Sequence, residues 1–362
     1  MKGFDFRKAQ ILVCMGNGGV GKTTLAAALG VLAAQRGLKV VVLTIDPAKR
    51  LATTLGIEGS KDITRVPGQT YSGELFASVV DHKKTFDDFV WRAAAKSEAA
   101  KKLFQNKLYQ QLSTSLSGSQ DFTALEKLYS TYESKEFDLI ILDTPPAKHA
   151  IDFLNAPQKL AVLFNDKVAR WFRESKNRSV GGVFLNILNT GTKQVLGLME
   201  SLTGSELLRE LSDFFLSIEQ WQERLEERIT NVHRMMVNPQ TQFCLVTSFD
   251  QAKLAEAEYF LREIRKGGYH LRSVILNRSF PEWLNPQTPA VKEAPKGCET
   301  LFQVYRQERS YYQTRSRDHA DFAAKAGREI QVLRLPEMEE AISDLSGLEK
   351  LAKIIEQQGE PS

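Results

Sequence analysis

A glycine-rich segment near the start of the chain carries residue types that can hold phosphate. It reads Gly16-Asn17-Gly18-Gly19-Val20-Gly21-Lys22-Thr23-Thr24 and stands between an apolar run and a helical pattern. Glycines let the backbone wrap around phosphates with its N–H groups turned inward, and a helix start adds the positive end of its dipole. The segment predicts a P-loop that binds ATP, with Lys22 on the β and γ phosphates and the Thr23 hydroxyl on Mg²⁺. The alternative is a glycine-rich turn without a ligand.

An aspartate at the end of a later apolar segment is suited to metal chemistry. Residues 137–143 read FDLIILD, and a strand that ends in an aspartate brings a carboxylate close to the magnesium of a P-loop, usually through a water. Asp143 is therefore the predicted metal residue. An aspartate in this position can instead cap a helix.

A third carboxylate follows another apolar segment. Asp46-Pro47 comes directly after residues 40–45, and the carboxyl ends of parallel strands form the crevice in which such sheets bind ligands. Asp46 is predicted to orient the water that attacks the γ-phosphate. The alternative is a turn-forming Asp-Pro pair.

Short apolar segments alternate with helical patterns and would position these residues. The predicted buried strands are residues 11–15, 40–45, 139–142, 243–247 and 274–276, with weaker candidates at 76–80 and 330–335. The first predicted helix covers residues 24–35 and ends before Gly37. Such alternation is typical of a doubly wound α/β fold with a mostly parallel sheet, here of the P-loop NTPase type.

Two stretches break this alternation, because they show helical spacing and lack strand-like runs. We interpret residues 85–134 and 158–240 as a helical subdomain inserted into the fold. Residues 1–84, 135–157 and 241–362 then form the P-loop ATPase core.

Composition excludes several classes of protein. The 48 lysines and arginines are scattered and nearly balanced by 44 acidic residues, so nothing points to nucleic acid. The longest apolar runs are far below the ~20 residues of a membrane-spanning helix, and no signal-peptide pattern is present. We expect a cytoplasmic protein without an integral membrane segment.

The cysteines do not form a recognisable metal or disulfide pattern. Cys14, Cys244 and Cys298 include no CxxC pair. Cys14 and Cys244 lie in apolar runs and are expected to be small buried residues.

With these motifs in place, the chain resembles the ATPases of arsenical pumps and of tail-anchored-protein targeting, the ArsA/Get group. The resemblance rests on the sequences GNGGVGKTT at 16–24, IDPAKRL at 45–51, DTPPAKHA at 143–150, ILNR at 275–278 and LPEMEEAI at 335–342. These motifs span nearly the whole chain in the order found in the family.

The resemblance implies further roles. Asp46 with Pro47 would form a first switch, and Asp143 with His149 a second switch that reports the γ-phosphate to the helical subdomain. Asn277 would pair with adenine, with Arg278 and the loop at Pro336 close by. A lone histidine after a turn can instead be structural.

Departures from the family pattern concern charge and cysteine. Most members carry a second lysine where this chain has Asn17, and that lysine reaches the phosphates of the other subunit of a dimer. We therefore expect slow intrinsic hydrolysis, unless a lysine-bearing paralogue in a heterodimer, Lys49 or Arg50 supplies the charge. The zinc-binding CxxC is absent, and an arsenite-binding cysteine cluster cannot be assembled.

The helical subdomain raises the question of a partner. Apolar residues between 183 and 199 could line a groove for a hydrophobic protein client, or form ordinary core. An amphipathic C-terminal segment, Leu345, Leu348, Leu351, Ile354 and Ile355, is expected to dock onto the sheet rather than a membrane.

Three functional hypotheses follow. The first is a homodimeric or heterodimeric Mg²⁺-dependent ATPase whose closure on nucleotide controls a client-binding or partner-binding lobe. The second is an ATP-binding regulatory subunit with little hydrolysis. The third, a partitioning ATPase of the ParA/MinD type, is weakened by the long helical insertions and by the lack of a basic DNA-binding face.

Overall fold

The computed structural model describes residues 6–45, 50–58, 62–94, 101, 104–106, 109–110, 120–144, 222–284 and 290–358. The chain divides into two compact units. Unit 1 consists of Met1–Val79, Thr131–Ile151 and Val237–Ser362, and unit 2 of Val80–Ser130 and Asp152–Met236. Because residues 145–221 lie outside the described part, the predicted domain boundaries stay a prediction.

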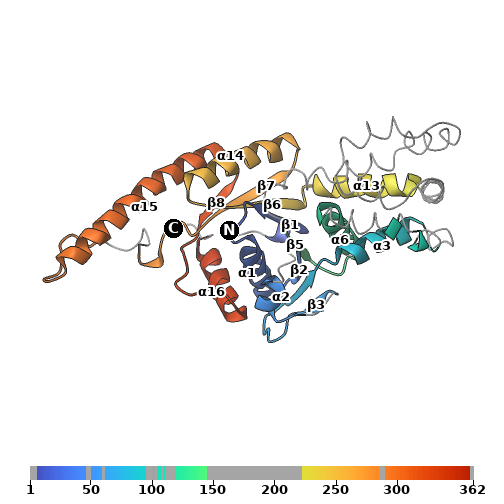
Figure 1. Cartoon of the computed structure of the whole chain (residues 1–362), viewed down its shortest axis with the longest axis horizontal. Helices are drawn as coiled ribbons and strands as arrows, with labels where there is room; N and C mark the ends of the chain where they lie inside the picture. The colour runs from blue at the N-terminus through green and yellow to red at the C-terminus, as the bar shows by residue number, and fades with distance from the viewer. Residues whose placement is uncertain are drawn as a thin grey trace, which may run out of the picture. The chain divides into compact units, whose positions relative to one another are not determined.

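Unit 1 is built on an eight-stranded sheet in the order β3-β4-β2-β5-β1-β6-β7-β8 (Figure 1). The strands are β1 (Ile11–Gly16), β2 (Lys39–Thr44), β3 (Thr64–Arg65), β4 (Glu74–Val79), β5 (Leu139–Asp143), β6 (Thr241–Ser248), β7 (His270–Asn277) and β8 (Gln331–Arg334). All neighbours pair in parallel except β3, which is antiparallel to β4. The predicted α/β fold is therefore confirmed. The strand β3 was not predicted, since two residues show no periodicity.

Helices connect the strands, and those of unit 1 cover its sheet. The described helices of at least six residues are α1 (Lys22–Gln35), α2 (Arg50–Leu55), α3 (His82–Ala93), α6 (Gln120–Ser134), α13 (Gln222–Met236), α14 (Gln251–Lys266), α15 (Glu299–Ala326) and α16 (Leu345–Gln358). Short 3₁₀ turns occur at Phe6–Lys8 and Glu282–Leu284. Within unit 1, α1 and α16 lie together, and α14 and α15 form a second pair (Figure 1).

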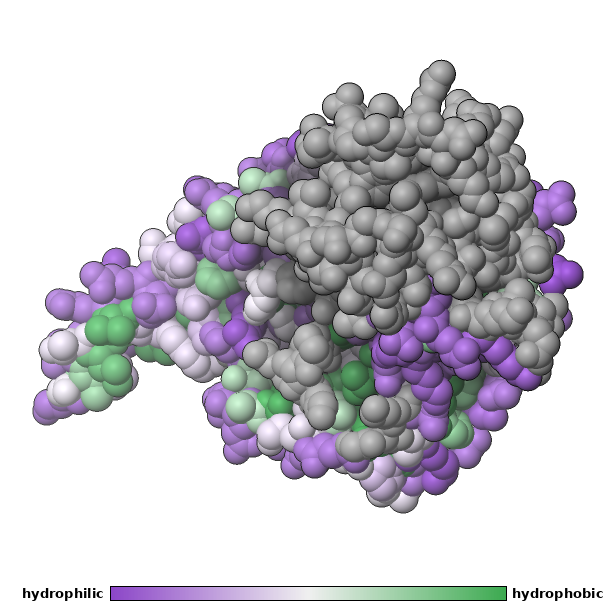
Figure 2. Space-filling view, turned by 45° about the vertical axis from the view of Figure 1, so that its right-hand side comes forward, coloured by the Kyte–Doolittle hydropathy of each residue, from purple (hydrophilic) through white to green (hydrophobic). Residues whose placement is uncertain are grey.

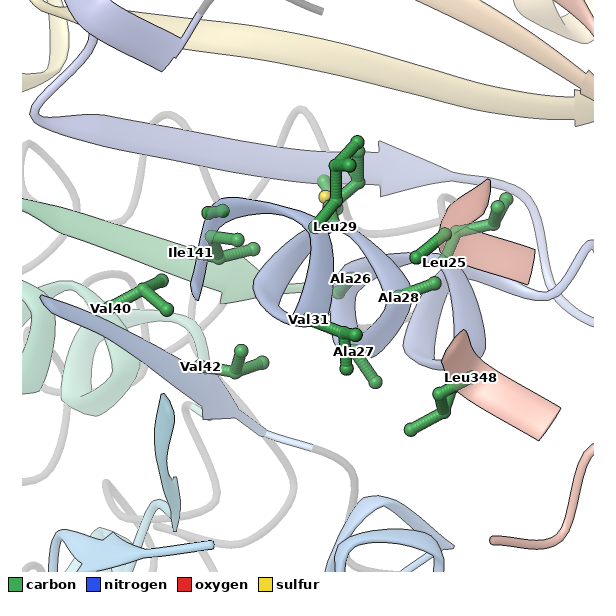
Figure 3. Close-up of a cluster of buried hydrophobic side chains, with 14 of the residues drawn as sticks. Leu25, Ala26, Ala27, Ala28, Leu29, Val31, Val40, Val42, Ile141 and Leu348 are labelled. Carbon is green, nitrogen blue, oxygen red and sulfur yellow. The ribbon is translucent and has the colours of Figure 1, made fainter. Parts of the chain in front are cut away.

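The core of unit 1 lies between α1 and the central strands. Helix α1 is apolar all round, because it packs against the sheet and against α16. Leu25, Leu29 and Val31 of α1 belong to the same buried cluster as Val42 and Ile141 of the sheet and Leu348 of α16 (Figure 3). A Cβ at Gly30 would lie 2.6 Å from Val42 Cγ2, so glycine allows the close approach of α1 to β2.

The C-terminal helix α16 packs in the protein interior, but mainly against α1 and not directly onto the sheet as predicted. Leu348, Leu351 and Ile355 are buried in the same cluster as α1. Their main neighbour is α1 rather than the sheet itself. The amphipathic face of α16 is thus accounted for by core packing, and in the described part of the chain no helix is long and apolar enough to cross a membrane.

Two predicted core cysteines lie side by side in the sheet. Cys14 of β1 and Cys244 of β6 are register partners, and both are free and buried. The contact with Cys244 and burial raise the pKa of Cys14 well above its ordinary value. Since thiolates bind metals and thiols do not, this pair fits small core residues, as expected from the sequence.

Unit 2 contains its own buried ion pair. Glu126 of α6 is 1% exposed and accepts from Arg228 of α13, with Arg228 Nη2 2.6 Å from Glu126 Oε1 and Arg228 Nε 2.9 Å from both carboxylate oxygens. Such a bidentate pair fixes the two side chains relative to each other. We assign it a structural role in joining α6 to α13.

Candidate active site

The P-loop lies at the carboxyl end of β1, between β5 and β6. Strand β1 ends at Gly16, and α1 begins at Lys22, with Gly21 as its N-cap in the left-handed conformation at φ 88°. A Cβ at Gly16 would collide with the carbonyl oxygen of Val246, and one at Gly21 would lie 2.6 Å from Asn277 Nδ2. Close neighbours therefore require glycine at both ends of the loop.

Lys22 lies inside this loop rather than in solvent. Its side chain is buried, and Nζ donates a hydrogen bond of 2.8 Å to the backbone carbonyl of Asn17. The bond spans the loop and holds the ammonium at Asn17, near the end of β1. A cation at this place meets the amides and dipole of a helix N-terminus, which together attract anions.

Asp143 connects the end of β5 to α1 and to β2. It ends β5, is 1% exposed, and accepts at Oδ2 from Thr23 Oγ1 at 2.7 Å and from Thr44 Oγ1 at 2.8 Å. The predicted metal residues Thr23 and Asp143 are thus in direct contact. Hydroxyl and carboxylate oxygens are ligands that Mg²⁺ prefers, often with waters between, so the pair fits a magnesium site.

Thr44 was missed in the sequence analysis. It ends β2, with Ile45 between it and the Asp46-Pro47 motif, and a hydroxyl near the end of a predicted strand was the available signal. Thr144 was missed as well, and its N–H and Oγ1 both donate to the Cys14 carbonyl, at 3.2 and 2.9 Å. The two threonines hold Asp143 and the residue after it against β1 and β2.

On the other side of the P-loop, Asn277 connects β7 to the loop. Its Nδ2 donates to the Val20 carbonyl at 2.8 Å, and its Oδ1 accepts from Arg278 N at 3.1 Å. Arg278 has φ 52°, an unusual conformation for a residue other than glycine. Asn277 is therefore at the P-loop, and its contact with adenine stays a prediction.

The segment that contains Pro336 is held next to the end of β7. Leu335 N donates to Leu276 O at 2.9 Å, and Leu335 O accepts from Ser279 N and Ser279 Oγ at 2.8 and 2.9 Å. Pro336 itself is buried. The segments that follow β7 and β8 thus form one connected rim.

Several predicted site residues fall outside the described part of the chain. These are Asp46, Pro47, Lys49 and His149, while Arg50 is described only as the first residue of α2. Their roles stay predictions. Among the described residues, no group of three or more histidines, cysteines, aspartates and glutamates could hold a metal ion.

Substitution of Asp143 by asparagine tests its role in metal binding. Asparagine can still accept from Thr23 and Thr44, so we expect folding to be retained, but it brings no negative charge. Loss of a residue that acts through a metal-bound water lowers metal affinity or activity by roughly 10- to 100-fold. The measurement is ATP hydrolysis against Mg²⁺ concentration, with Asp138→Asn, an exposed aspartate just before β5, as the control. An unchanged Mg²⁺ dependence would show that Asp143 has no role in metal binding.

The site has a glycine loop between a central parallel strand and the first helix, a buried lysine, and a threonine that donates to a carboxylate. These features define the chain as a P-loop nucleotide-binding protein. The family model described as "Anion-transporting ATPase" matches residues 9–357, and the chain belongs to this family. It is therefore an ATPase, and the resemblance inferred from the sequence is confirmed.

Two curated proteins are similar to the chain over most of its length. A "Putative arsenical pump-driving ATPase 1" of Aquifex aeolicus is 24% identical over 368 residues, covering 96% of this chain and 78% of that protein. The protein "ATPase get3" of Schizosaccharomyces pombe is 24% identical over 274 residues, covering 75% of this chain and 73% of that protein.

Proposed function

We propose that this ATPase binds Mg·ATP in the P-loop and uses it to close a dimer and rearrange a lobe that binds a client or partner. The contact of 2.7 Å between Thr23 Oγ1 and Asp143 Oδ2, one residue from the buried Lys22, carries the nucleotide part of this proposal. It supports a magnesium ion at the position where the triphosphate enters the loop.

The residues divide the work by chemistry. Loop amides of residues 16–24 bind the phosphates, Lys22 neutralises charge on the γ-phosphate, and Thr23 with Asp143 holds Mg²⁺. Asp46 orients the attacking water, and Asn277, Arg278 and Pro336 surround adenine. Phosphoryl transfer needs mainly such positioning and charge stabilisation.

The signal to the lobe would pass through the two switches. Asp143 and Thr144 are anchored to α1, β2 and β1, and the chain continues from there to Pro145, Pro146 and His149. A change at the γ-phosphate or Mg²⁺ can therefore move the segment after β5. We propose that this segment and Asp46-Pro47 transmit the nucleotide state to the helical subdomain.

An exposed part of α15 supports the dimer. No residue of 299–316 is buried, although Leu301 is 68% and Val304 49% exposed. Hydrophobic side chains gather at the end of the arm that α15 forms (Figure 2). Helices gain most of their stability from packing of an apolar face, so these exposed apolar residues favour a partner. The charged residues of this part of α15 are of both signs, and neither sign prevails. A second copy of the chain, with the same mixture of charges, fits this surface.

Leu301→Asp is expected to weaken this dimer, because it places a charge in the apolar contact. Light scattering with ADP, with ATP and with a transition-state mimic should show a nucleotide-dependent dimer for the native chain and a monomer for the variant. Gln303→Asp, two residues away and exposed, is the matched control. A variant that dimerises like the native chain would exclude this surface.

The nucleotide part is tested by calorimetry with ATP and Mg²⁺, followed by phosphate release from the purified chain. Saturable binding with turnover supports the proposal. Binding without turnover supports the second candidate, an ATP-binding regulatory subunit that acts with a lysine-bearing paralogue. Asn17 is the observation that favours this second candidate, because it brings no charge to the P-loop.

A further inference from the structure

Three basic side chains lie close together between α15 and the carboxyl ends of β6 and β8. Leu333 of β8 packs into the core cluster around α1 and α16. Because successive strand residues point to opposite faces, Arg334 points to the face covered by α15, where its Nη2 donates to Ser316 Oγ at 3.0 Å. Arg315 and His319 lie on either side of Ser316 in α15. The cluster therefore lies on the face of the sheet opposite α1.

The two arginines are held by aromatic rings more than by acids. The Arg315 guanidinium lies 5.6 Å from the Phe249 ring and 5.2 Å from the Tyr311 ring, and Arg334 lies 5.7 Å from the Phe280 ring. The acidic partner within the described residues is Asp318, at 4.0 Å from Arg315 Nη1. Arg334 has no ion pair in the described part of the chain. The two half-buried arginines thus have one long ion pair between them among the residues that the structure describes.

His319 adds a buried polar group to this cluster. It is 2% exposed, and within the described residues neither ring nitrogen has a hydrogen-bond partner at normal geometry, although the Phe249 backbone acts as a weak partner that raises its pKa slightly. Its ring packs edge-on against Phe249, with centroids 6.2 Å apart. Burial and the neighbouring Arg334 lower the pKa of His319 to about 4. The imidazole is therefore neutral at physiological pH and has one N–H to donate.

We propose that Arg315, Arg334 and His319 form a binding site for a small oxyanion of the phosphate or carboxylate class. A guanidinium presents a planar fork of N–H donors that matches both anions. Aromatic rings lie against both guanidiniums, and no described residue gives Arg315 Nη1 or Arg334 Nε a hydrogen-bond partner. An anion here supplies the negative charge that the arginines lack and an acceptor for His319. Buried polar groups without partners are rare in folded proteins, and a ligand accounts for this one.

The proposed site is linked to the rim of the P-loop. Arg334 directly precedes Leu335, whose N–H and carbonyl bond to the segment around Asn277. An anion that holds Arg334 would therefore favour one position of the segment at Pro336. We expect it to change nucleotide affinity, and this consequence rests on the proposed function, whereas the anion site itself does not.

The test follows the His319 ring by NMR in the full chain without nucleotide. Inorganic phosphate and acetate are titrated separately at constant ionic strength, with chloride as the reference salt. His319 is assigned among the five histidines with His319→Gln. We expect phosphate, acetate or both to raise the pKa of His319 saturably, since a nearby anion favours the imidazolium. A saturable response to one anion alone identifies its class as the occupant, and a response no larger than that to chloride overturns the proposal.

Variants separate this site from general charge effects. Arg315→Met and Arg334→Met should each weaken binding by roughly 10- to 100-fold, because each removes charged hydrogen bonds. Arg317→Met, an exposed arginine of the same helix, should not. If Arg334→Met fails to fold, Arg334→Lys replaces it. This variant keeps the charge without the fork of donors and should bind the anion with intermediate affinity. Equal loss in Arg317→Met would contradict the proposal.

Lys22→Met distinguishes this site from the P-loop, which can itself bind phosphate. The response of His319 should persist in that variant, even if the P-loop no longer binds an anion. Its disappearance would assign the response to the P-loop and overturn the proposal. If the native chain shows the His319 response but does not bind ATP, the anion site stays valid and the proposed nucleotide function is disproved.

Discussion

Replacing Lys22 by methionine is expected to lower kcat for ATP hydrolysis by roughly 10²- to 10³-fold, the usual effect of losing one donor that stabilises developing charge. The ammonium already lies inside the loop, 2.8 Å from the Asn17 carbonyl. It therefore needs only a small movement to reach a phosphate. Methionine has a similar length and an apolar stem, so the variant removes the charge with little change in packing.

Phosphate release under saturating Mg·ATP is the measurement for Lys22→Met, with calorimetry to separate binding from turnover. Lys266→Met, an exposed lysine in the last turn of α14, is the matched control and should behave like the native chain. Both variants should have the thermal unfolding midpoint of the native chain. Native turnover in Lys22→Met would show that hydrolysis does not occur at this loop.

Replacing Asn17 by lysine is expected to raise kcat, because a cation supplied across an interface in phosphoryl transfer contributes roughly 10³ to 10⁵ in rate. The gain will be smaller if the new side chain is not placed at the partner's phosphates. Folding should be retained, since the bond from Asn17 to Lys22 uses the backbone carbonyl, which every residue has. Asn17 itself is buried, at 5% exposed, but the neighbouring Gly18 and Gly19 are exposed, and a longer side chain can extend past them towards solvent.

Further variants separate the effect of the charge at position 17 from other effects of Asn17→Lys. Asn17→Gln lengthens the side chain without charge and should not accelerate hydrolysis. If the lysine acts on a second copy, the gain should grow with protein concentration and be lost when Leu301→Asp is added. If Asn17→Lys shows no gain while the native chain binds ATP without turnover, the chain acts as a regulatory subunit that needs a paralogue.

Much of the sheet was predictable, because each buried strand is a short continuous run of apolar residues. β1, β2, β5 and β6 lie within one or two residues of their predicted positions. For β7 only the last part was predicted, since its first residues, His270 to Arg272, are polar or half-exposed and carry no apolar signal. The docking of α16 was also predictable, because its few basic residues argue against a membrane surface.

The P-loop was predictable from a local pattern of residues alone. Its function depends on backbone geometry within nine consecutive residues, 16–24, where glycines and a helix start act locally. The hydrogen bonds that Asp143 accepts from Thr23 and Thr44, which lie 120 and 99 positions away, arise only when the chain is folded. The same holds for Arg334 and Ser316, which belong to different elements. Contacts of this kind depend on the order of strands and the faces of helices, and no local pattern of residues encodes them.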